Sequence, residues 1–142
     1  MSDGDDEETR ARVQAIFMHL QSLRANMETT LRELKSDIGH YEHVTALSSS
    51  IGAEHRALCH LGHGVHVQAV IPNASQGVHV HVGLGFFVEL PWPEAVDVAN
   101  ARVAILQGRV ALTEATIVGL DTDLLEVLAE NGLDPSALRG DG

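Results

Sequence analysis

The sequence has little cysteine, few aromatic residues and few basic residues, and each shortage excludes a class of protein. Its one cysteine, Cys59, cannot form an internal disulfide, so the fold does not depend on an oxidising compartment. Aromatic residues make up 4% of the chain although 44% is hydrophobic, which favours elongated aliphatic packing over a thick round core. Nine Lys and Arg against 20 Asp and Glu give a net charge of −11. This balance argues against direct binding to nucleic acid or to an anionic membrane.

The sequence also lacks the features of an exported or membrane-spanning chain. The first eight residues, MSDGDDEE, have neither the basic start nor the apolar run of a signal peptide. No apolar stretch approaches the ~18 residues that a membrane-spanning helix needs. We therefore expect no membrane partner.

The charges that are present divide the chain into segments. Residues 1–8 are strongly acidic and predict a disordered tail. Between Ala57 and Leu90 the only formal charge is Glu89, whereas residues 91–131 are rich in acid, which is typical of a solvated helix face. Residues 135–142 form a short end rich in Gly and Pro, which we expect to be flexible.

A heptad pattern predicts a helix over about residues 9–51. Apolar residues recur at alternating spacings of four and three, which keeps one narrow stripe facing a partner helix. The triple serine 48–50 and Gly52 end the pattern. The stripe comprises Val13, Phe17, Leu20, Arg24, Met27, Leu31, Leu34, Ile38, Tyr41, Thr45 and Ser48.

A second heptad pattern predicts a helix over about residues 92–131. Pro93 falls in its first turn, and Asn131-Gly132 provides a left-handed stop. At about 1.5 Å per residue each helix is roughly 55–65 Å long, so we expect the two to pair as a rod. The stripe comprises Val96, Ala99, Val103, Leu106, Val110, Thr113, Ile117, Leu120, Leu124 and Val127.

The centre, about residues 57–90, has the two-residue period of β-strands. Valines alternate with polar residues over 65–71 and again over 78–82, and glycine-rich turns are expected at 62–64 and 83–85. The fold class is therefore α+β: two β-hairpins lie between an N-terminal and a C-terminal helix that form an antiparallel coiled coil. Residues 9–134 are expected to make up this single domain.

This order of elements, with heptads on both helices, resembles the alpha class of prefoldin subunits. The strongest local match is residues 61–96, within which VHVGLGFFVEL at 80–90 is followed by Glu94-Ala95. Valines before Gly-x-Gly, then Phe-Phe-x-Glu-Leu and Glu-Ala, are specific in combination. Pro91 departs from the family, which places a hydroxyl-bearing cap at this position.

The resemblance implies a subunit of a hetero-oligomeric, ATP-independent co-chaperone. In that family the hairpins of several subunits assemble into a β-barrel body, and the tips of the coiled coils hold non-native polypeptides for a chaperonin. It implies other prefoldin or prefoldin-like subunits and non-native polypeptides as partners, no cofactor, and a location in the cytoplasm, with the nucleus as a second location. The branch most similar in sequence is also tied to transcriptional regulation in animals.

Two sets of residues are the candidate functional sites. Short strands with bare edges need partners, so we expect one set to contribute to a body shared between subunits, in competition with a core inside the chain. This assembly set comprises Val65, Val67, Ile71, Val78, Val80, Val82, Phe86 and Val88. Apolar residues at the free end of the rod suit weak contacts with unfolded chains, in competition with ordinary packing of the rod. This tip set comprises Ile16, Phe17, Met18, Leu20, Leu124, Leu125, Leu128 and Leu133.

The histidines and the single cysteine suggest other chemistry, which we consider less well supported. His60, His63 and His66 are spaced by three, but alternation with apolar residues explains the hairpin histidines as an outward strand face, and we expect no metal site. Cys59 and His60 are neighbours on a strand and point to opposite sides, so they do not form a catalytic pair. We expect no enzyme activity.

Two functions remain open from the sequence. One is the co-chaperone subunit described above. The other is a coiled-coil adaptor or transcription cofactor that scaffolds partners without holding unfolded chains.

Overall fold

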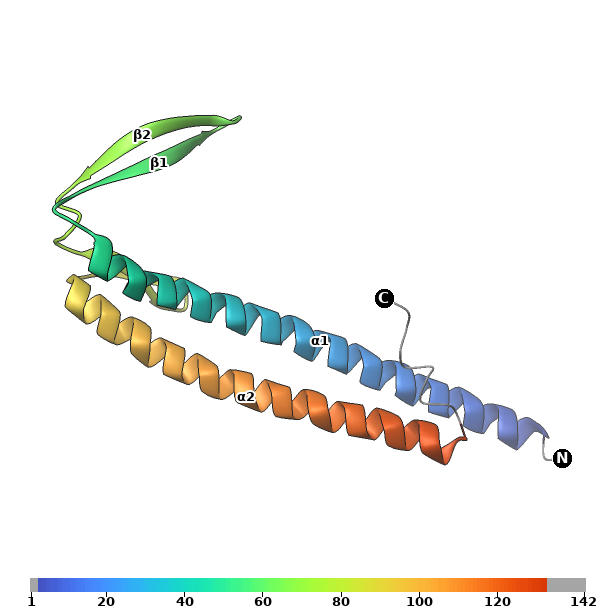
Figure 1. Ribbon diagram of the computed structural model, residues 1–142. Helices are drawn as coiled ribbons and strands as arrows, with labels where there is room; N and C mark the ends of the chain where they lie inside the picture. Colours follow the sequence, from blue (N-terminus) through green and yellow to red (C-terminus); the bar gives the residue numbers. More distant parts are fainter. Residues whose placement is uncertain (1–2, 133–142) are drawn as a thin grey trace. The chain divides into compact units, whose positions relative to one another are not determined.

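The computed structural model describes residues 3–132, and the order of its elements confirms the predicted fold. Along the sequence, one long helix precedes four strands and a second long helix follows them (Figure 1). The elements are α1 (Asp3–Ser50), β1 (Glu54–Gly62), β2 (Val65–Pro72), β3 (Val78–Gly83), β4 (Phe86–Leu90) and α2 (Trp92–Glu130). The chain divides into two compact units, which are described in turn. The rod unit contains residues 3–35 and 108–132, and the hairpin unit contains residues 36–107.

In the rod unit, the two predicted stripes are the buried sides of α1 and α2. Every stripe residue of this unit is buried or half-buried, including the polar Arg24 and Thr113. The most buried are Leu34, Leu124 and Leu128, and Leu128 lies just outside the predicted stripe. An ion pair between Lys35 Nζ and Glu114 Oε1 (3.4 Å) joins the helices at their surface. The heptad spacing thus predicted the packing of this unit correctly.

The start of α1 differs from the expected disordered tail, because the helix already begins at Asp3. Glu7 and Glu8 lie in the first turns, where acids stabilise the positive end of the helix dipole. Glu8 also pairs with Arg12 one turn later (2.6 Å). These contacts extend the helix six residues before the predicted start at residue 9. The expected flexible end, 135–142, lies outside the described residues.

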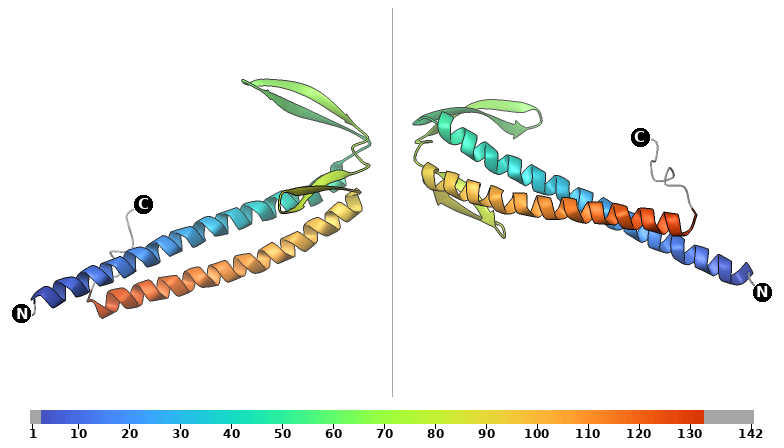
Figure 2. Two further views of the ribbon diagram at one scale, coloured as in Figure 1. Left: turned by 180° about the vertical axis from the view of Figure 1, so that it is seen from behind. Right: turned by 60° about the horizontal axis from the view of Figure 1, so that its bottom comes forward.

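In the hairpin unit, the four strands form two separate antiparallel sheets, β1–β2 and β3–β4 (Figures 1 and 2). Both turns have the same form: three consecutive residues with positive φ, Gly62-His63-Gly64 in one and Gly83-Leu84-Gly85 in the other. Two consecutive positive φ angles are the signature of a type I′ turn, which suits the twist of a hairpin. β1 begins at Glu54, three residues before the predicted boundary.

α2 begins directly after β4, at the point where the sequence departs from the family. The carbonyl of Pro91 accepts a hydrogen bond from the amide of Ala95 (2.9 Å), so Pro91 itself occupies the capping position and the helix starts at Trp92 as predicted. The missing hydroxyl cap therefore does not shorten the helix. Glu94 in the first turn favours the dipole.

α2 is also long and apolar enough to cross a membrane, judged by length and composition alone. The expectation that no apolar stretch reaches this length was therefore wrong for α2, because its apolar residues are interspersed with single polar ones. Only 11% of its most apolar 18-residue window is buried within the protein. The apolar residues of α2 therefore include a large group that faces outward.

Candidate assembly and binding surfaces

The β3–β4 hairpin is packed against the helices of its unit (Figure 2). Val80, in the middle of β3, is 3% exposed. The buried Tyr41 of α1 donates a hydrogen bond from its hydroxyl to the backbone carbonyl of His81 (2.8 Å). One face of this hairpin is thus fixed to the helices by an apolar contact and a polar one.

A second polar contact holds the connection that leads into this hairpin. The indole Nε1 of Trp92, at the start of α2, donates to the carbonyl of Ala74 (2.8 Å), and both residues are buried. The amide of Ala74 donates in turn to the carbonyl of Ala53 (3.1 Å), which precedes β1. The segments that enter β1 and leave β2 are therefore tied to each other and to the start of α2.

A cavity of about 250 Å³ lies where β3 meets the two helices. Arg102 of α2 lines it, with its guanidinium 5.9 Å from the centre of the Tyr41 ring. Arg102 Nε is buried and has no hydrogen-bond partner within residues 3–132. An attraction between cation and ring offsets part of the cost of this unpaired donor. His40, His79 and His81 also line the cavity.

The β1–β2 hairpin has no such buried face. Val67 and Ile71 lie on one face and Leu58 and Val70 on the other, and all four side chains are exposed. Within residues 3–132 each of the four strands pairs with only one other, so every strand leaves one edge unpaired. A two-stranded hairpin without a packed face is at best marginally stable in water.

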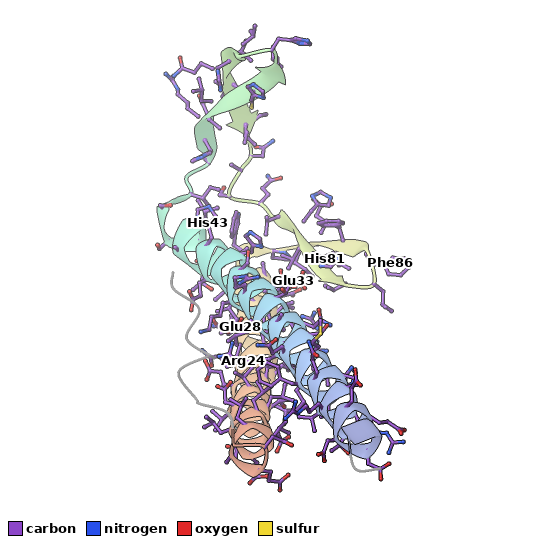
Figure 3. The ribbon with its side chains drawn as sticks, turned by 90° about the vertical axis from the view of Figure 1, so that its right-hand side faces the viewer. Arg24, Glu28, Glu33, His43, His81 and Phe86 are labelled. Carbon is purple, nitrogen blue, oxygen red and sulfur yellow. The ribbon has the colours of Figure 1, made fainter. Side chains whose placement is uncertain are left out.

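The structure divides the predicted assembly set. Val80 belongs to the core of its own chain, and Val78 is half-buried. The remaining six are exposed, and Phe86 projects from the end of β3–β4 away from the helices (Figure 3). These six are Val65, Val67, Ile71, Val82, Phe86 and Val88. Phe87 and Leu84, next to Phe86, are also exposed and were not in the predicted set.

The predicted tip set divides in the same way. Leu124 and Leu128 are 2% and 3% exposed and pack inside the rod, while Phe17 and Leu20 are half-buried. Only Ile16, Met18 and Leu125 are exposed, and Leu133 lies outside the described residues. With the helices paired, three of the seven described residues are exposed to another molecule. The role of this set in binding clients remains a prediction.

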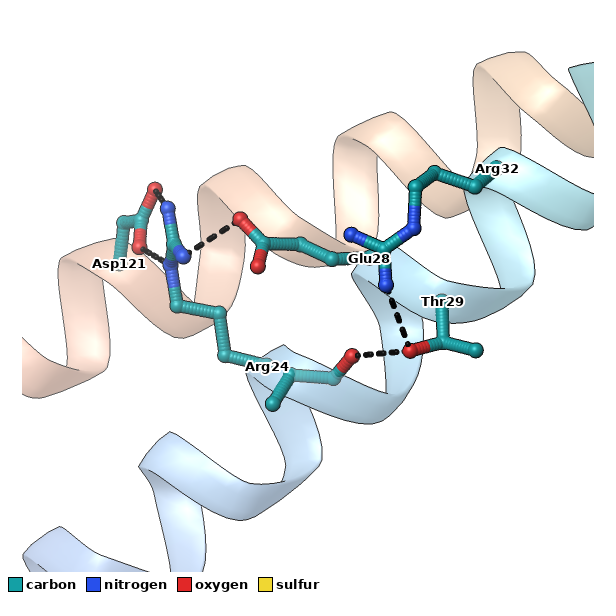
Figure 4. Close-up of polar contacts among 6 residues, drawn as sticks. Arg24, Glu28, Thr29, Arg32 and Asp121 are labelled. Atoms are coloured by element: carbon teal, nitrogen blue, oxygen red, sulfur yellow. Dashed lines mark hydrogen bonds and ion pairs between the residues drawn. The ribbon is translucent and has the colours of Figure 1, made fainter.

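An ion-pair network in the rod unit was not foreseen. Arg24, the one charged residue in the stripe of α1, reaches across to the carboxylate of Asp121 on α2 and to Glu28 Oε1 on its own helix (2.6 Å) (Figure 4). The hydrogen bond to Asp121 raises the pKa of Arg24 above its ordinary value, while burial opposes it. A polar residue at such a position fixes the register of a coiled coil. In the sequence, this pair could have been recognised from an arginine within the apolar stripe of α1 and acidic residues beside the apolar stripe of α2.

Among the described hairpin residues, one pair of histidine rings comes together. His60 and His66 face each other across β1 and β2, with ring centres 4.7 Å apart. His66 Nδ1 lies 3.2 Å from the carbonyl of Gly64. Within the described residues no three His, Cys, Asp or Glu side chains are placed to hold one metal ion.

The comparison with protein families agrees with this architecture. The prefoldin subunit family matches residues 18–130. A cryo-EM structure of filamentous PFD from Methanocaldococcus jannaschii is similar to the chain, with 20% identity and a TM-score of 0.49, covering 88% of this chain and 98% of the other. No curated protein matched the sequence. The family match spans both helices and both hairpins, and the chain therefore belongs to the prefoldin subunit family, whose members are chaperone subunits that assemble with one another.

Proposed function

We propose that this chain is a subunit of a hetero-oligomeric, ATP-independent prefoldin or prefoldin-like co-chaperone. Within that family we assign it to the alpha class, to the branch of the ubiquitously expressed transcript protein, on the strength of the residues 80–90 and Glu94-Ala95. Its expected partners are other prefoldin or prefoldin-like subunits, non-native polypeptides and a chaperonin. The expected location is the cytoplasm, with the nucleus as a second location.

The observation that carries the proposal is the β1–β2 hairpin. Its apolar side chains are exposed on both faces and its two outer edges are unpaired within the described residues. Unpaired strand edges of this kind form hydrogen bonds with strands of other chains, which also cover the exposed faces. Strands of neighbouring subunits would satisfy both, which explains how the hairpins serve assembly.

Assembly is tested by native mass spectrometry of the complex purified from its own cell. We expect the wild-type chain in a complex with other subunits, and we expect Val67→Asp to be recovered alone, because a carboxylate would be buried in the shared body. Thr29→Asp, on the exposed side of α1, is the matched control and should assemble normally. A wild-type chain that is recovered as a stable monomer would refute the proposal.

Client binding is tested separately by following the light scattering of a denatured protein with the assembled complex. The exposed Ile16, Met18 and Leu125 are the residues to replace together by Ser, because Leu128 is needed for the packing of the rod. We expect the wild-type complex to suppress aggregation and the triple variant to lose most of that effect.

The alternative is an adaptor or transcription cofactor scaffold that assembles but holds no unfolded chain. The burial of Leu124 and Leu128 favours it, because it leaves few apolar side chains for clients. A complex that assembles normally and leaves aggregation unchanged would establish this alternative in place of the co-chaperone.

A further inference from the structure

The outward side of α2 is uncharged from Gly108 to Leu125, and the exposed Glu126, the next residue at the same spacing, ends this uncharged stretch. It lies opposite the stripe that packs on α1, and all its residues are exposed. Leu112 is 71% and Val118 65% exposed. We define this α2 outer face by Gly108, Ala111, Leu112, Ala115, Val118, Gly119, Thr122 and Leu125. A helix side that faces only water normally carries charged and polar residues, and this one has a single hydroxyl.

The sizes of these residues follow a pattern of their own. Gly108, Leu112, Ala115, Gly119 and Thr122 are spaced by four and three, as in a coiled-coil stripe, and small residues flank the one large residue. A Cβ atom added at Gly108 or Gly119 would meet no described atom within 4 Å, so packing inside the chain does not require either glycine. Each glycine costs a helix about 1 kcal/mol relative to alanine. Close approach of another backbone accounts for both.

The charges along one border of this face suit a second copy of the same chain. Arg109, Thr116 and Asp123 follow one another at intervals of seven residues, and all three are exposed. Neither Arg109 nor Asp123 forms an ion pair with any residue from 3 to 132. An antiparallel copy related by a two-fold axis at Thr116 would place Arg109 opposite Asp123 twice, once on each side of the axis.

We propose that the α2 outer face binds the same face of a second copy of this chain, antiparallel, with the two-fold axis at Thr116. In this register Leu112 of each copy lies against the small residues Gly119 and Thr122 of the other. Val118 lies beside Ala115 of the other copy, and Leu125 lies beside Gly108. Large residues thus meet small ones throughout the interface. At its border, Arg109 of each copy lies opposite Asp123 of the other.

The same features argue against the other possible occupants. An anionic lipid surface would be repelled by the acidic charge of this chain, whose net charge is −11. An unrelated apolar helix would satisfy Leu112 but would not account for charges of opposite sign placed symmetrically about Thr116. The face contains none of the residues of the hairpin strands, so this pairing does not depend on the assembly proposed above.

The decisive experiment is a charge swap, measured by sedimentation velocity of the full chain over a range of concentrations. We expect weak self-association of the wild type that is weakened at least about tenfold by Arg109→Glu alone and by Asp123→Arg alone, because each creates two like-charge contacts. An equimolar mixture of the two variants should associate like the wild type, since both contacts then join opposite charges. Val67→Asp, introduced in all samples, removes association through the hairpins.

Arg32→Glu on α1 is the matched charge reversal and should leave the association unchanged. Circular dichroism of each variant checks that the helices are intact. A mixture that fails to associate, single variants that associate like the wild type, or a wild type that stays monomeric would each overturn the proposal. Association that requires added anionic vesicles would identify a lipid surface instead and would overturn it as well.

A cross-link tests the geometry in the same background with Cys59→Ser. Thr116→Cys lies on the proposed axis and should form a disulfide between copies under mild oxidation. Glu130→Cys lies 14 residues from the axis, so its two copies would be roughly 40 Å apart and should not cross-link. Equal cross-linking at the two positions would contradict an antiparallel pair centred on Thr116.

Discussion

The two hairpins have nearly the same local design and opposite environments. Each is a two-stranded antiparallel sheet closed by a turn of three positive-φ residues, and each has a register shift just before its turn. Yet β3–β4 buries Val80 and receives a hydrogen bond from Tyr41, whereas β1–β2 exposes apolar side chains on both faces. The difference comes from residues outside the strands, on α1 and at the start of α2. It shows that β3–β4 belongs to the chain's own core, and it supports our proposal that another molecule completes β1–β2.

The largest expected effect comes from placing a charge on the buried hairpin. Val80→Asp should lower the free energy of unfolding by about 3 kcal/mol or more, because the carboxylate would be buried without a partner. Val67→Asp, the matched change on β1–β2, should alter the unfolding of the isolated chain by less than about 0.5 kcal/mol. Urea denaturation followed by circular dichroism measures both. Equal losses would show that the two hairpins are packed alike.

A smaller effect is expected where the connection into β3 is fixed. Trp92→Phe keeps an aromatic ring but removes the donor to Ala74, and it should cost about 1.5 kcal/mol because a buried carbonyl loses its partner. Phe86→Leu, at an exposed aromatic, is the control and should change the stability by less than about 0.5 kcal/mol. If both variants unfold at the wild-type urea concentration, the Trp92 contact does not hold the connection.

The hydrogen bond from α1 to β3 should contribute about 1 kcal/mol. Tyr41→Phe removes only the hydroxyl, so amide hydrogen exchange should accelerate in β3 and β4 and stay unchanged in β1 and β2. Mass spectrometry of peptic fragments separates the two hairpins. Acceleration spread evenly over all four strands would mean that the hairpins open together.

The smallest effect should be shared by both hairpins, because it concerns their turns. Leu84 and His63 both have positive φ, a conformation that Asn tolerates better than Leu. Leu84→Asn should stabilise the chain by about 0.5–1 kcal/mol, and His63→Asn by less, since His already favours this region more than Leu does. Thermal unfolding of the two single variants measures this order. Destabilisation by Leu84→Asn would show that the leucine side chain makes contacts of its own.

The fold could be predicted from the sequence because its main signals are periodic. Spacings of four and three mark a helix side that packs on another helix, and the burial of the rod unit follows them. Alternation and glycine-rich turns likewise identified both hairpins. The start of α1 was not predicted because a run of acidic residues is typical of a solvated tail. Whether such a run forms the first turns of a helix instead depends on ion pairs such as that of Glu8 with Arg12.

The division within the candidate sites could not be predicted in this way. Val78, Val80 and Val82 have the same alternation, and only contact with the helices shows that Val80 is the buried one. Leu124 and Leu125 are neighbours, yet one packs in the rod and the other is exposed. Periodicity identifies which residues share a side of an element. It does not identify what lies against that side.

The central claim is that β1–β2 is completed by another subunit. Amide hydrogen exchange of residues 54–72, compared between the isolated chain and the assembled complex, tests it most directly. The account predicts fast exchange at the outer edges of β1 and β2 in the isolated chain and strong protection in the complex, with β3 largely unchanged at its buried centre. Equal exchange of residues 54–72 in both states, in a complex shown to be assembled, would contradict it.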